Sequence, residues 1–251
     1  MRKRLGSWLL GLILPATLLA IWAWLAASGR FSMTQLPSPL AVFDVIGELL
    51  RRGELWWHIQ TSLQRVLLGY LIGASIGITL GSIVGLSRFA YRAITPTVQA
   101  IRAVPSLAWV PLLIIWLGID ESPKLTLIAI GAFFPVFTTV VSGLQHVEKS
   151  LVEVGRAYGL HHVRLIAGIH FPAAAPQIFA GLRLGLAQSW MFLVAAELIA
   201  SSKGLGFLLM DSQGTGRTDI VMLAIVLLAL LGKFSDILIG LVERRALAWY
   251  K

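Results

Sequence analysis

The sequence has no cysteine, which excludes disulfide bonds, cysteine metal sites and thiol nucleophiles. It is also short of charge. Only 13% of the 251 residues are Asp, Glu, Lys or Arg, about half of the roughly 25% found in soluble domains. Hydrophobic residues make up 57%, and long uncharged stretches separate the few charges. This pattern is typical of a protein whose solvent is lipid and excludes an ordinary soluble domain.

Uncharged runs predict where the chain crosses the membrane, because a spanning helix needs about 17 to 25 mostly apolar residues. Four runs meet this length, and two further apolar stretches meet it while containing charges. The predicted fold is therefore an all-α, polytopic membrane protein with six transmembrane helices, at 5–29, 66–87, 103–119, 125–145, 173–200 and 220–242.

The first run follows Arg2, Lys3 and Arg4, which is also the pattern of a cleaved signal peptide. Its length of about 25 residues exceeds the roughly 7 to 15 of a signal-peptide core, and residues 25–27 form a poor cleavage site. We interpret the run as a retained anchor.

The charges predict the orientation. With both termini in the cytoplasm, segments 88–102 and 146–172 are cytoplasmic, and twelve Lys and Arg lie inside against seven outside. The net charge is then about +9 inside and about zero outside, as the positive-inside rule requires. The +9 of the whole chain therefore needs no nucleic-acid partner.

The segment 30–65 is expected on the periplasmic side. Leu36-Pro37-Ser38-Pro39 excludes a helix there. Residues 40–57 then mix apolar and charged side chains at helical spacing, which predicts an amphipathic helix too polar to span. We expect it at the membrane interface, with Trp56 and Trp57 leading into the second span.

The loop 146–172 has more internal order than a connector needs. Ser150 with Glu153 three residues later predicts a capping box at the start of a helix, and Gly159 predicts its end. A second short helix, 162–170, is expected to end against Pro172. An ordinary solvated connector with normal caps remains the alternative on spacing alone.

Several kinds of chemistry have no motif in the sequence. There is no G-x-x-x-x-G-K-[ST] loop for ATP and no H-E-x-x-H for a metal. The stretches 204–206 and 214–216 lack the strand and helix that a nucleotide fingerprint requires, so we interpret them as turns. The sequence predicts no enzyme activity, cofactor site or metal site in this chain.

The loop resembles the EAA loop of binding-protein-dependent ABC importer permeases. Glu153, Gly159, Ile169 and Phe171-Pro172 occupy the first, seventh, seventeenth, nineteenth and twentieth places of that signature. Val154 and Gly155 depart from the two small residues that follow the glutamate, and Phe171 replaces the usual leucine. The run 102–121, and residues 36–39, 53–56 and 232–236, are similar to the taurine, aliphatic sulfonate and nitrate branch, most of all to the aliphatic sulfonate permeases.

The resemblance implies the MetI-like importer permease fold and a division of the chain into three parts. These are an anchor with a periplasmic interfacial segment (1–57), the permease core with the EAA loop (58–242), and a cytoplasmic tail (243–251). It also implies location in the bacterial inner membrane. The expected partners are membrane lipid, a second copy of the chain, two cytoplasmic ATPase subunits that bind ATP and Mg, and a periplasmic solute-binding protein.

The resemblance further implies that the loop couples the permease to the ATPase. Glu153 would anchor a short helix in a groove of the ATPase, and Gly159 would provide the turn back to the membrane. The implied coupling residues are Glu153, Gly155, Arg156, Ala157, Tyr158, Gly159 and Leu160.

Charges within spans are costly and should face protein or water. Arg183 and Glu197 share a broad helical face with Gln188 and Trp190 nearby. Arg183 either attracts an anionic sulfonate or pairs with a carboxylate or headgroup, and we expect Glu197 to be structural. The predicted pathway residues are Arg102, Arg183, Gln188 and Trp190.

Two further patterns predict packing. Lys233 and Asp236, three apart, can neutralise each other. Glycines at 69, 73, 77, 81 and 85 form a ridge for close helix packing.

The predicted function is import of an aliphatic sulfonate, such as an alkanesulfonate or taurine-like anion, by alternating access. Nitrate or a thiamin-precursor pyrimidine is the alternative substrate. A secondary transporter would be expected to show internal repeats and broken helices in pairs, and an intramembrane hydrolase needs a nucleophile and a base. Neither pattern is present in the sequence.

Overall fold

The computed structural model describes residues 2–248, except for the side chains of residues 2–12, 106 and 200. Within this part every regular element is helical, so the all-α prediction is confirmed. The elements are α1 (Arg2–Ala27), α2 (Pro39–Arg51), α3 (Glu54–Leu86), α4 (Arg88–Arg102), a 3-10 turn (Ser106–Ala108), α5 (Trp109–Leu117), α6 (Glu121–Gln145), α7 (Lys149–Ala157), α8 (His162–Leu165), a π-helical turn (Ile166–His170), α9 (Phe171–Ala200), α10 (Leu205–Gly214) and α11 (Thr218–Ala246).

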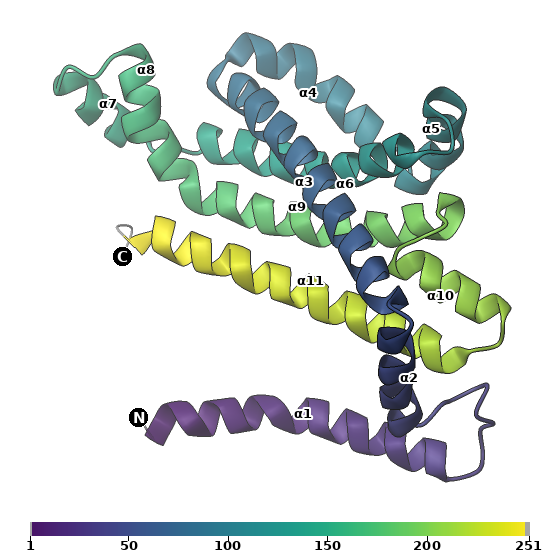
Figure 1. Cartoon of the computed structure of the whole chain (residues 1–251). Coiled ribbons are helices and arrows are strands. Elements are labelled where there is room, and N and C mark those ends of the chain that lie inside the picture. Colours follow the sequence, from purple (N-terminus) through teal and green to yellow (C-terminus); the bar gives the residue numbers. More distant parts are fainter. Residues whose placement is uncertain (1, 249–251) are drawn as a thin grey trace.

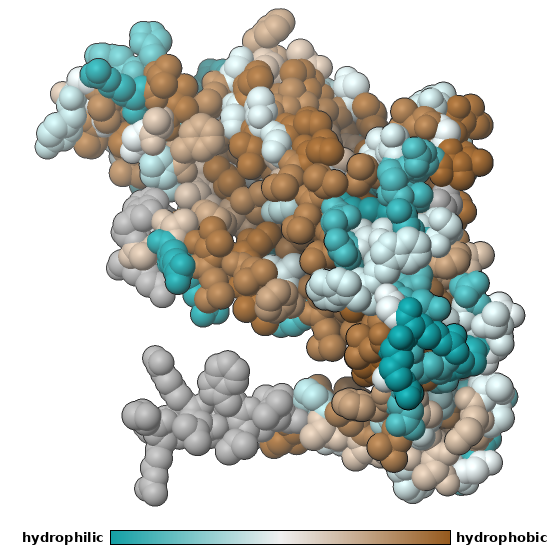
Figure 2. All heavy atoms as spheres, viewed as in Figure 1, coloured by the Kyte–Doolittle hydropathy of each residue, from teal (hydrophilic) through white to brown (hydrophobic). Residues whose placement is uncertain are grey.

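The long helices run between two ends of the molecule. Among the described residues, four helical runs are long and apolar enough to span a membrane, namely Glu54–Leu86, Glu121–Gln145, His162–Ile199 and Thr218–Ala246. The beginning of α1, the end of α11 and the α7–α8 pair lie at one end of the molecule, here called the α7 end (Figure 1). The α2 and α10 helices lie at the opposite end, the α10 end. Hydrophobic side chains cover much of the surface between the two ends (Figure 2).

The third crossing differs from the prediction. A single spanning helix over 103–119 was expected, but this stretch contains only the 3-10 turn and the nine-residue α5. Pro105 and Pro111 lack the amide hydrogens that a continuous helix needs. Residues 88–102, expected as a cytoplasmic segment, form α4 instead. Figure 1 shows that α4 returns the chain toward the α10 end, so α4 and α5 together make this pass.

The segment before the second span also differs in detail. An amphipathic helix is present as predicted, and α2 buries Val42, Val45 and Leu49 against α10 and α11. It ends at Arg51 rather than at 57, because Gly53 adopts φ +72°, a left-handed conformation that interrupts the helix between α2 and α3. The α3 helix then starts at Glu54, twelve residues before the predicted start. The predicted domain boundary at 57/58 therefore falls within α3.

The core is built from α3, α6 and α9. Every glycine of the ridge on α3 faces α6. A Cβ at Gly77 or Gly81 would lie 3.0 Å from the Val136 or Val140 side chain, and one at Gly73 would collide with the backbone carbonyl of Ala129. The predicted close packing is confirmed, and it explains how 33 residues of α3 stay in register with α6.

Candidate functional site

The α7–α8 elbow turns as the sequence predicts. Gly159 has φ +77°, which favours glycine. The Leu160 N–H donates to Gly155 O at 3.0 Å and the Gly159 N–H donates to Arg156 O at 2.9 Å. These two bonds form a Schellman motif, which ends α7 and lets the chain fold back.

Two details of the loop were predicted wrongly. The capping box is absent: α7 begins at Lys149 with Glu148 at the N-cap position, and the Ser150 hydroxyl contacts Glu148 Oε2 at 3.4 Å rather than capping the helix. The second helix also does not end at Pro172. It continues through the π-helical turn into α9, and we attribute the turn to Pro172, which cannot donate a hydrogen bond and crowds the residue four positions before it.

One side of α7 is packed and the other is not. Gly155 is buried, and a Cβ there would lie 2.9 Å from Leu165 and 3.0 Å from Ile169, so only glycine lets α7 approach this closely. Leu151, Val154 and Tyr158 are exposed on the outer side, Tyr158 to 85%.

These three residues recur at helical spacing and form an apolar strip at the tip of the molecule. The sequence reasoning missed Leu151 and Val154 as surface residues. Their spacing of three and four residues was the available signal.

The other predicted residues of the elbow lie around this strip. Glu153, Arg156, Ala157 and Gly159 are exposed, and Leu160 is half-buried. The predicted coupling residues are therefore together on one projecting element, with Gly155 as its internal contact.

A buried polar network joins three helices near the α10 end. Arg65 of α3 donates from Nη1 to Glu197 of α9 at 2.8 Å, and from Nε and Nη2 to the two oxygens of Glu121 at 2.7 and 2.6 Å. The Arg65 and Glu197 side chains are only 3% and 0% exposed. Charges this deep persist only when paired. The structural role expected for Glu197 fits this geometry.

The same network fixes the start of α10. The Gly206 N–H donates to Glu197 Oε2 at 2.8 Å, and the Ser62 hydroxyl donates to the Glu197 carboxylate at 2.9 Å. The Leu205 N–H in turn donates to Ser62 Oγ at 2.8 Å. Because Glu197 accepts at the helix N-terminus, it also offsets the positive end of the helix dipole. The stretch 204–206 was predicted to be a turn, but only Gly204 precedes the helix, as its N-cap residue, and Leu205 and Gly206 are the first residues of α10.

A second, more exposed ion pair joins α2 to the beginning of α11. Arg217 donates to Glu48 at 2.9 Å and to Asp219 at 3.0 Å. The hydrogen bond from Arg217 is the main cause that lowers the pKa of Glu48 below its ordinary value. The pair holds the amphipathic helix against the beginning of α11.

The predicted pathway residues are not gathered in one place. Arg183 of α9 pairs with Asp236 at 2.9 Å and Glu243 at 3.2 Å, both on α11, which is the carboxylate partnership left open from the sequence. Lys233 lies 3.5 Å from Asp236, so this predicted pair is also present. Trp190 is buried.

The Trp190 indole N–H donates to the Ser235 hydroxyl at 2.9 Å, while Gln188 is half-buried. Trp190 and Arg183 therefore both connect α9 to α11.

Arg102 lies elsewhere, at the mouth of a cavity of about 200 Å³ between α4 and α6. Its lining mixes the polar Gln99, Thr138 and Ser142 with apolar side chains, among them Val98, Phe137 and Val141. The buried hydroxyl of Thr95 also lines it and has no hydrogen-bond partner. The polar groups of this lining suit contact with water or a polar solute. No cluster of His, Cys, Asp and Glu suited to a metal occurs among the described residues.

A membrane-embedded helical bundle with a projecting two-helix elbow defines the membrane subunit of an ABC transporter. A crystal structure of an amino acid ABC transporter with histidines shares the fold, with a TM-score of 0.65 at 16% identity over 80% of this chain and 97% of that one. Residues 75–247 match the family model described as "Binding-protein-dependent transport system inner membrane component". The chain belongs to this family of ABC importer permeases.

Individual relatives show which branch of the family this chain is similar to. Two proteins called SsuC, named for the transport of aliphatic sulfonates, are similar over almost the whole chain. That of Bacillus subtilis (strain 168) is 41% identical over 99% of this chain and 90% of its own, and that of Escherichia coli (strain K12) is 40% identical over 98% and 92%. A taurine permease of Escherichia coli and a nitrate import permease of Leptolyngbya laminosa are each 31% identical.

Proposed function

We propose that this chain is the permease subunit that moves an aliphatic sulfonate from the periplasm into the cytoplasm by alternating access. Two copies form the pathway, two separate ATPase subunits bind ATP and Mg and drive it, and a periplasmic binding protein delivers the solute. The α7 end faces the cytoplasm and the α10 end faces the periplasm, which agrees with the greater number of Lys and Arg at the α7 end.

The observation that carries this proposal is the exposed apolar strip of α7. Leu151, Val154 and Tyr158 would be costly to leave in water, and they project beyond the layer covered by hydrophobic side chains. A short amphipathic helix of this kind binds in a groove of a soluble partner. Since α8 continues through the π-helical turn into α9, a push on α7 tilts a spanning helix without an intervening flexible linker.

The predicted coupling residues take distinct parts in this docking. Glu153 and Arg156 supply polar contacts beside the strip, and Tyr158 supplies its largest apolar surface. Gly155 and Gly159 act within the elbow, the first by close packing and the second by its left-handed turn.

The pathway is proposed to follow the α4–α6 cavity. Arg102 supplies a cation there without an ion-pair partner among the described residues, whereas Arg183 already neutralises two carboxylates. We therefore place the main anion contact at Arg102 and give Arg183, Gln188 and Trp190 a supporting part in holding α9 and α11 together. Replacing Arg102 by Glu should lower uptake of the sulfonate, while Arg102→Lys should preserve most of it.

The absence of cysteine permits a clean test of the docking. Tyr158→Cys and Trp57→Cys each introduce the only thiol in the chain, one at the α7 end and one at the α10 end. In the assembled transporter, Tyr158→Cys should cross-link to the ATPase and resist an impermeant maleimide added outside the cell. Trp57→Cys should instead be labelled by the external maleimide and should not cross-link to the ATPase. Labelling of Tyr158→Cys from outside, or no cross-link, would refute the proposal.

The substrate requires a separate measurement. Proteoliposomes containing the permease, its ATPase and its binding protein should take up an alkanesulfonate or taurine in an ATP-dependent way. Uptake of nitrate or of a thiamin-precursor pyrimidine in preference to both sulfonates would assign the chain to another branch of the same family.

A further inference from the structure

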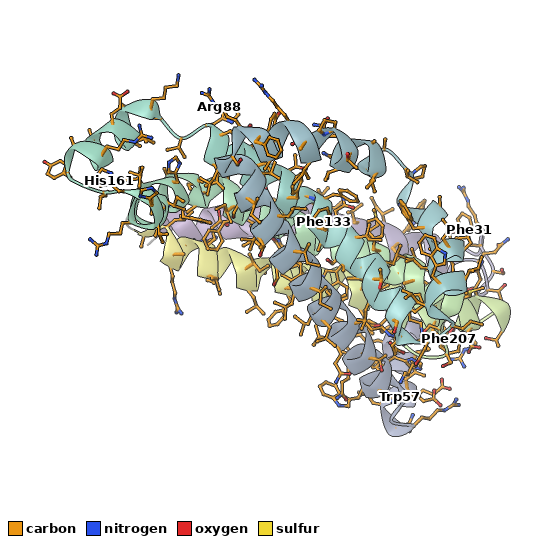
Figure 3. All side chains as sticks on the ribbon, turned by 90° about the horizontal axis from the view of Figure 1, so that it is seen from above. Phe31, Trp57, Arg88, Phe133, His161 and Phe207 are labelled. Atoms are coloured by element: carbon orange, nitrogen blue, oxygen red, sulfur yellow. The ribbon has the colours of Figure 1, made fainter. Side chains whose placement is uncertain are left out.

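A large groove separates the α7–α8 elbow from the corner between α3 and α4. Its volume is about 1060 Å³. Arg88 and Arg92 of α4 line one side, and Lys149 and Arg156 of α7 line the other. Arg88 and His161 mark its two sides in Figure 3. We call these four basic residues and the space between them the basic groove.

The charge of the groove is not balanced by the protein. Glu153 is the only carboxylate that lines it, against four permanent cations and three histidines. None of the four cations forms an ion pair within residues 2–248. At the α10 end the described cations are divided: Arg52, Arg65, Lys124 and Arg217 have carboxylate partners, and three others have none, namely Arg30, Arg51 and Lys203. Four unpaired cations that converge on one space favour an anionic ligand.

The position of the groove indicates where that anion comes from. Leu86 ends α3, and Arg88 follows after the capping residue Ser87, so the basic side chains begin where the apolar helix stops. Phe89, beside Arg88, is 83% exposed, which suits an aromatic side chain in contact with lipid. The groove lining also includes apolar side chains, among them Leu144 and Leu165. Cationic groups above an apolar floor match a phosphate joined to acyl chains.

We propose that the basic groove binds the phosphate of an anionic phospholipid from the leaflet at the α7 end, which the proposed function makes the cytoplasmic leaflet. The lipid phosphate accepts hydrogen bonds from the guanidinium groups of α4 and from Lys149 and Arg156 of α7. One lipid thereby bridges the α3–α4 corner and the elbow. Binding stiffens the elbow against the bundle, so coupling to the ATPase becomes dependent on anionic lipid.

The binding test uses the purified full-length chain in detergent without the ATPase. Ser150→Cys, next to the groove, carries an environment-sensitive dye as the only labelled thiol. The probes are short-chain phosphatidylglycerol, short-chain phosphatidylcholine and inorganic phosphate. We expect saturable binding of phosphatidylglycerol alone. Arg88→Gln/Arg92→Gln should weaken it about thirtyfold, the factor for two basic residues near an anionic lipid surface, and Arg88→Lys/Arg92→Lys should restore it to within about threefold.

Arg244→Gln/Arg245→Gln is the matched control, because it removes two exposed cations at the same end but outside the groove. It should leave the affinity unchanged. Equal displacement by inorganic phosphate, or unchanged binding in Arg88→Gln/Arg92→Gln, would overturn the proposal.

A partner ATPase that displaces the lipid, and that no longer binds Arg88→Gln/Arg92→Gln, would overturn it as well, because the groove would then be a protein interface. Failure of the Tyr158→Cys cross-link would instead refute the proposed function and leave the lipid result standing.

Discussion

Removing one partner of the buried Arg65–Glu197 pair should destabilise the protein strongly. Both side chains are almost fully buried, and Glu197 holds α3 and the beginning of α10 at once. Breaking a buried ion pair costs about 3–5 kcal/mol, because the remaining charge stays in a medium of low dielectric. For a chain of this size, about 1 kcal/mol corresponds to roughly 2–4 °C. Arg65→Met should therefore lower the unfolding midpoint by on the order of 10 °C.

A second ion pair in the same chain serves as the comparison. The Arg183–Asp236 pair has similar distances, but 41% and 32% of its side-chain surface stays accessible within the chain, so its charges are less desolvated by protein packing than those of Arg65 and Glu197. Arg183→Met should thus lower the midpoint by less than Arg65→Met does. The assay is thermal unfolding of the purified protein in detergent, followed by intrinsic tryptophan fluorescence.

A double-mutant cycle tests the cause. Arg65→Met with Glu197→Gln removes both buried charges, so the pair should lose less stability than the sum of the two single variants. Additive losses, or a loss in Arg65→Met no larger than that in Arg183→Met, would refute the reasoning.

Three further predictions follow from local geometry. Gly73→Leu should cost about 1–3 kcal/mol or more in thermal stability, because the new side chain meets the α6 backbone; Gly47→Ala, with open space around it, should be neutral or slightly stabilising. The Gly159→Asp permease should insert normally, while the partner ATPase hydrolyses ATP without uptake of the solute, and normal uptake in vesicles would contradict the role of the turn. Arg217 lowers the pKa of Glu48, so the stabilisation that this ion pair gives is complete above the ordinary Glu48 pKa of 4.5 and is lost as the pH falls through the lower pKa of the folded state. Cleavage by an acid protease between α2 and α3 should therefore rise in that pH range. Arg217→Gln should abolish this pH dependence of the cleavage.

The sequence predicts the helical class and the elbow well, because both depend on local patterns. Long apolar runs identify spanning helices by length alone, and a glycine after an amphipathic segment identifies a helix end. The ridge of glycines on α3 likewise predicts a close contact with another helix, but it does not identify that helix. These features need only residues that are near one another in the chain.

The wrong predictions concern positions where a residue distant in the sequence, or the backbone itself, determines the structure. Counting charges begins the second span after Arg65, but Glu197, 132 residues later, neutralises that arginine and lets α3 start at Glu54. Residues 103–119 are uncharged, yet two prolines prevent one helix. The Ser150–Glu153 pattern fits a capping box with Ser150 as the N-cap residue, yet the N-cap is Glu148, two residues earlier. The sequence also cannot show that Arg183 faces α11 while Arg102 opens onto a cavity.

The uninterrupted helical run from His162 to Ile199 has a mechanical consequence. Its 38 residues give a rod about 57 Å long at 1.5 Å per residue. One tip carries the elbow, and Glu197 near the other tip accepts a hydrogen bond from the Gly206 N–H at the start of α10. A tilt imposed at the first tip is therefore delivered to the opposite face as a single rigid movement. Under the proposed function, docking of the ATPase at the elbow and a change in the loop before α10 therefore share one continuous piece of backbone.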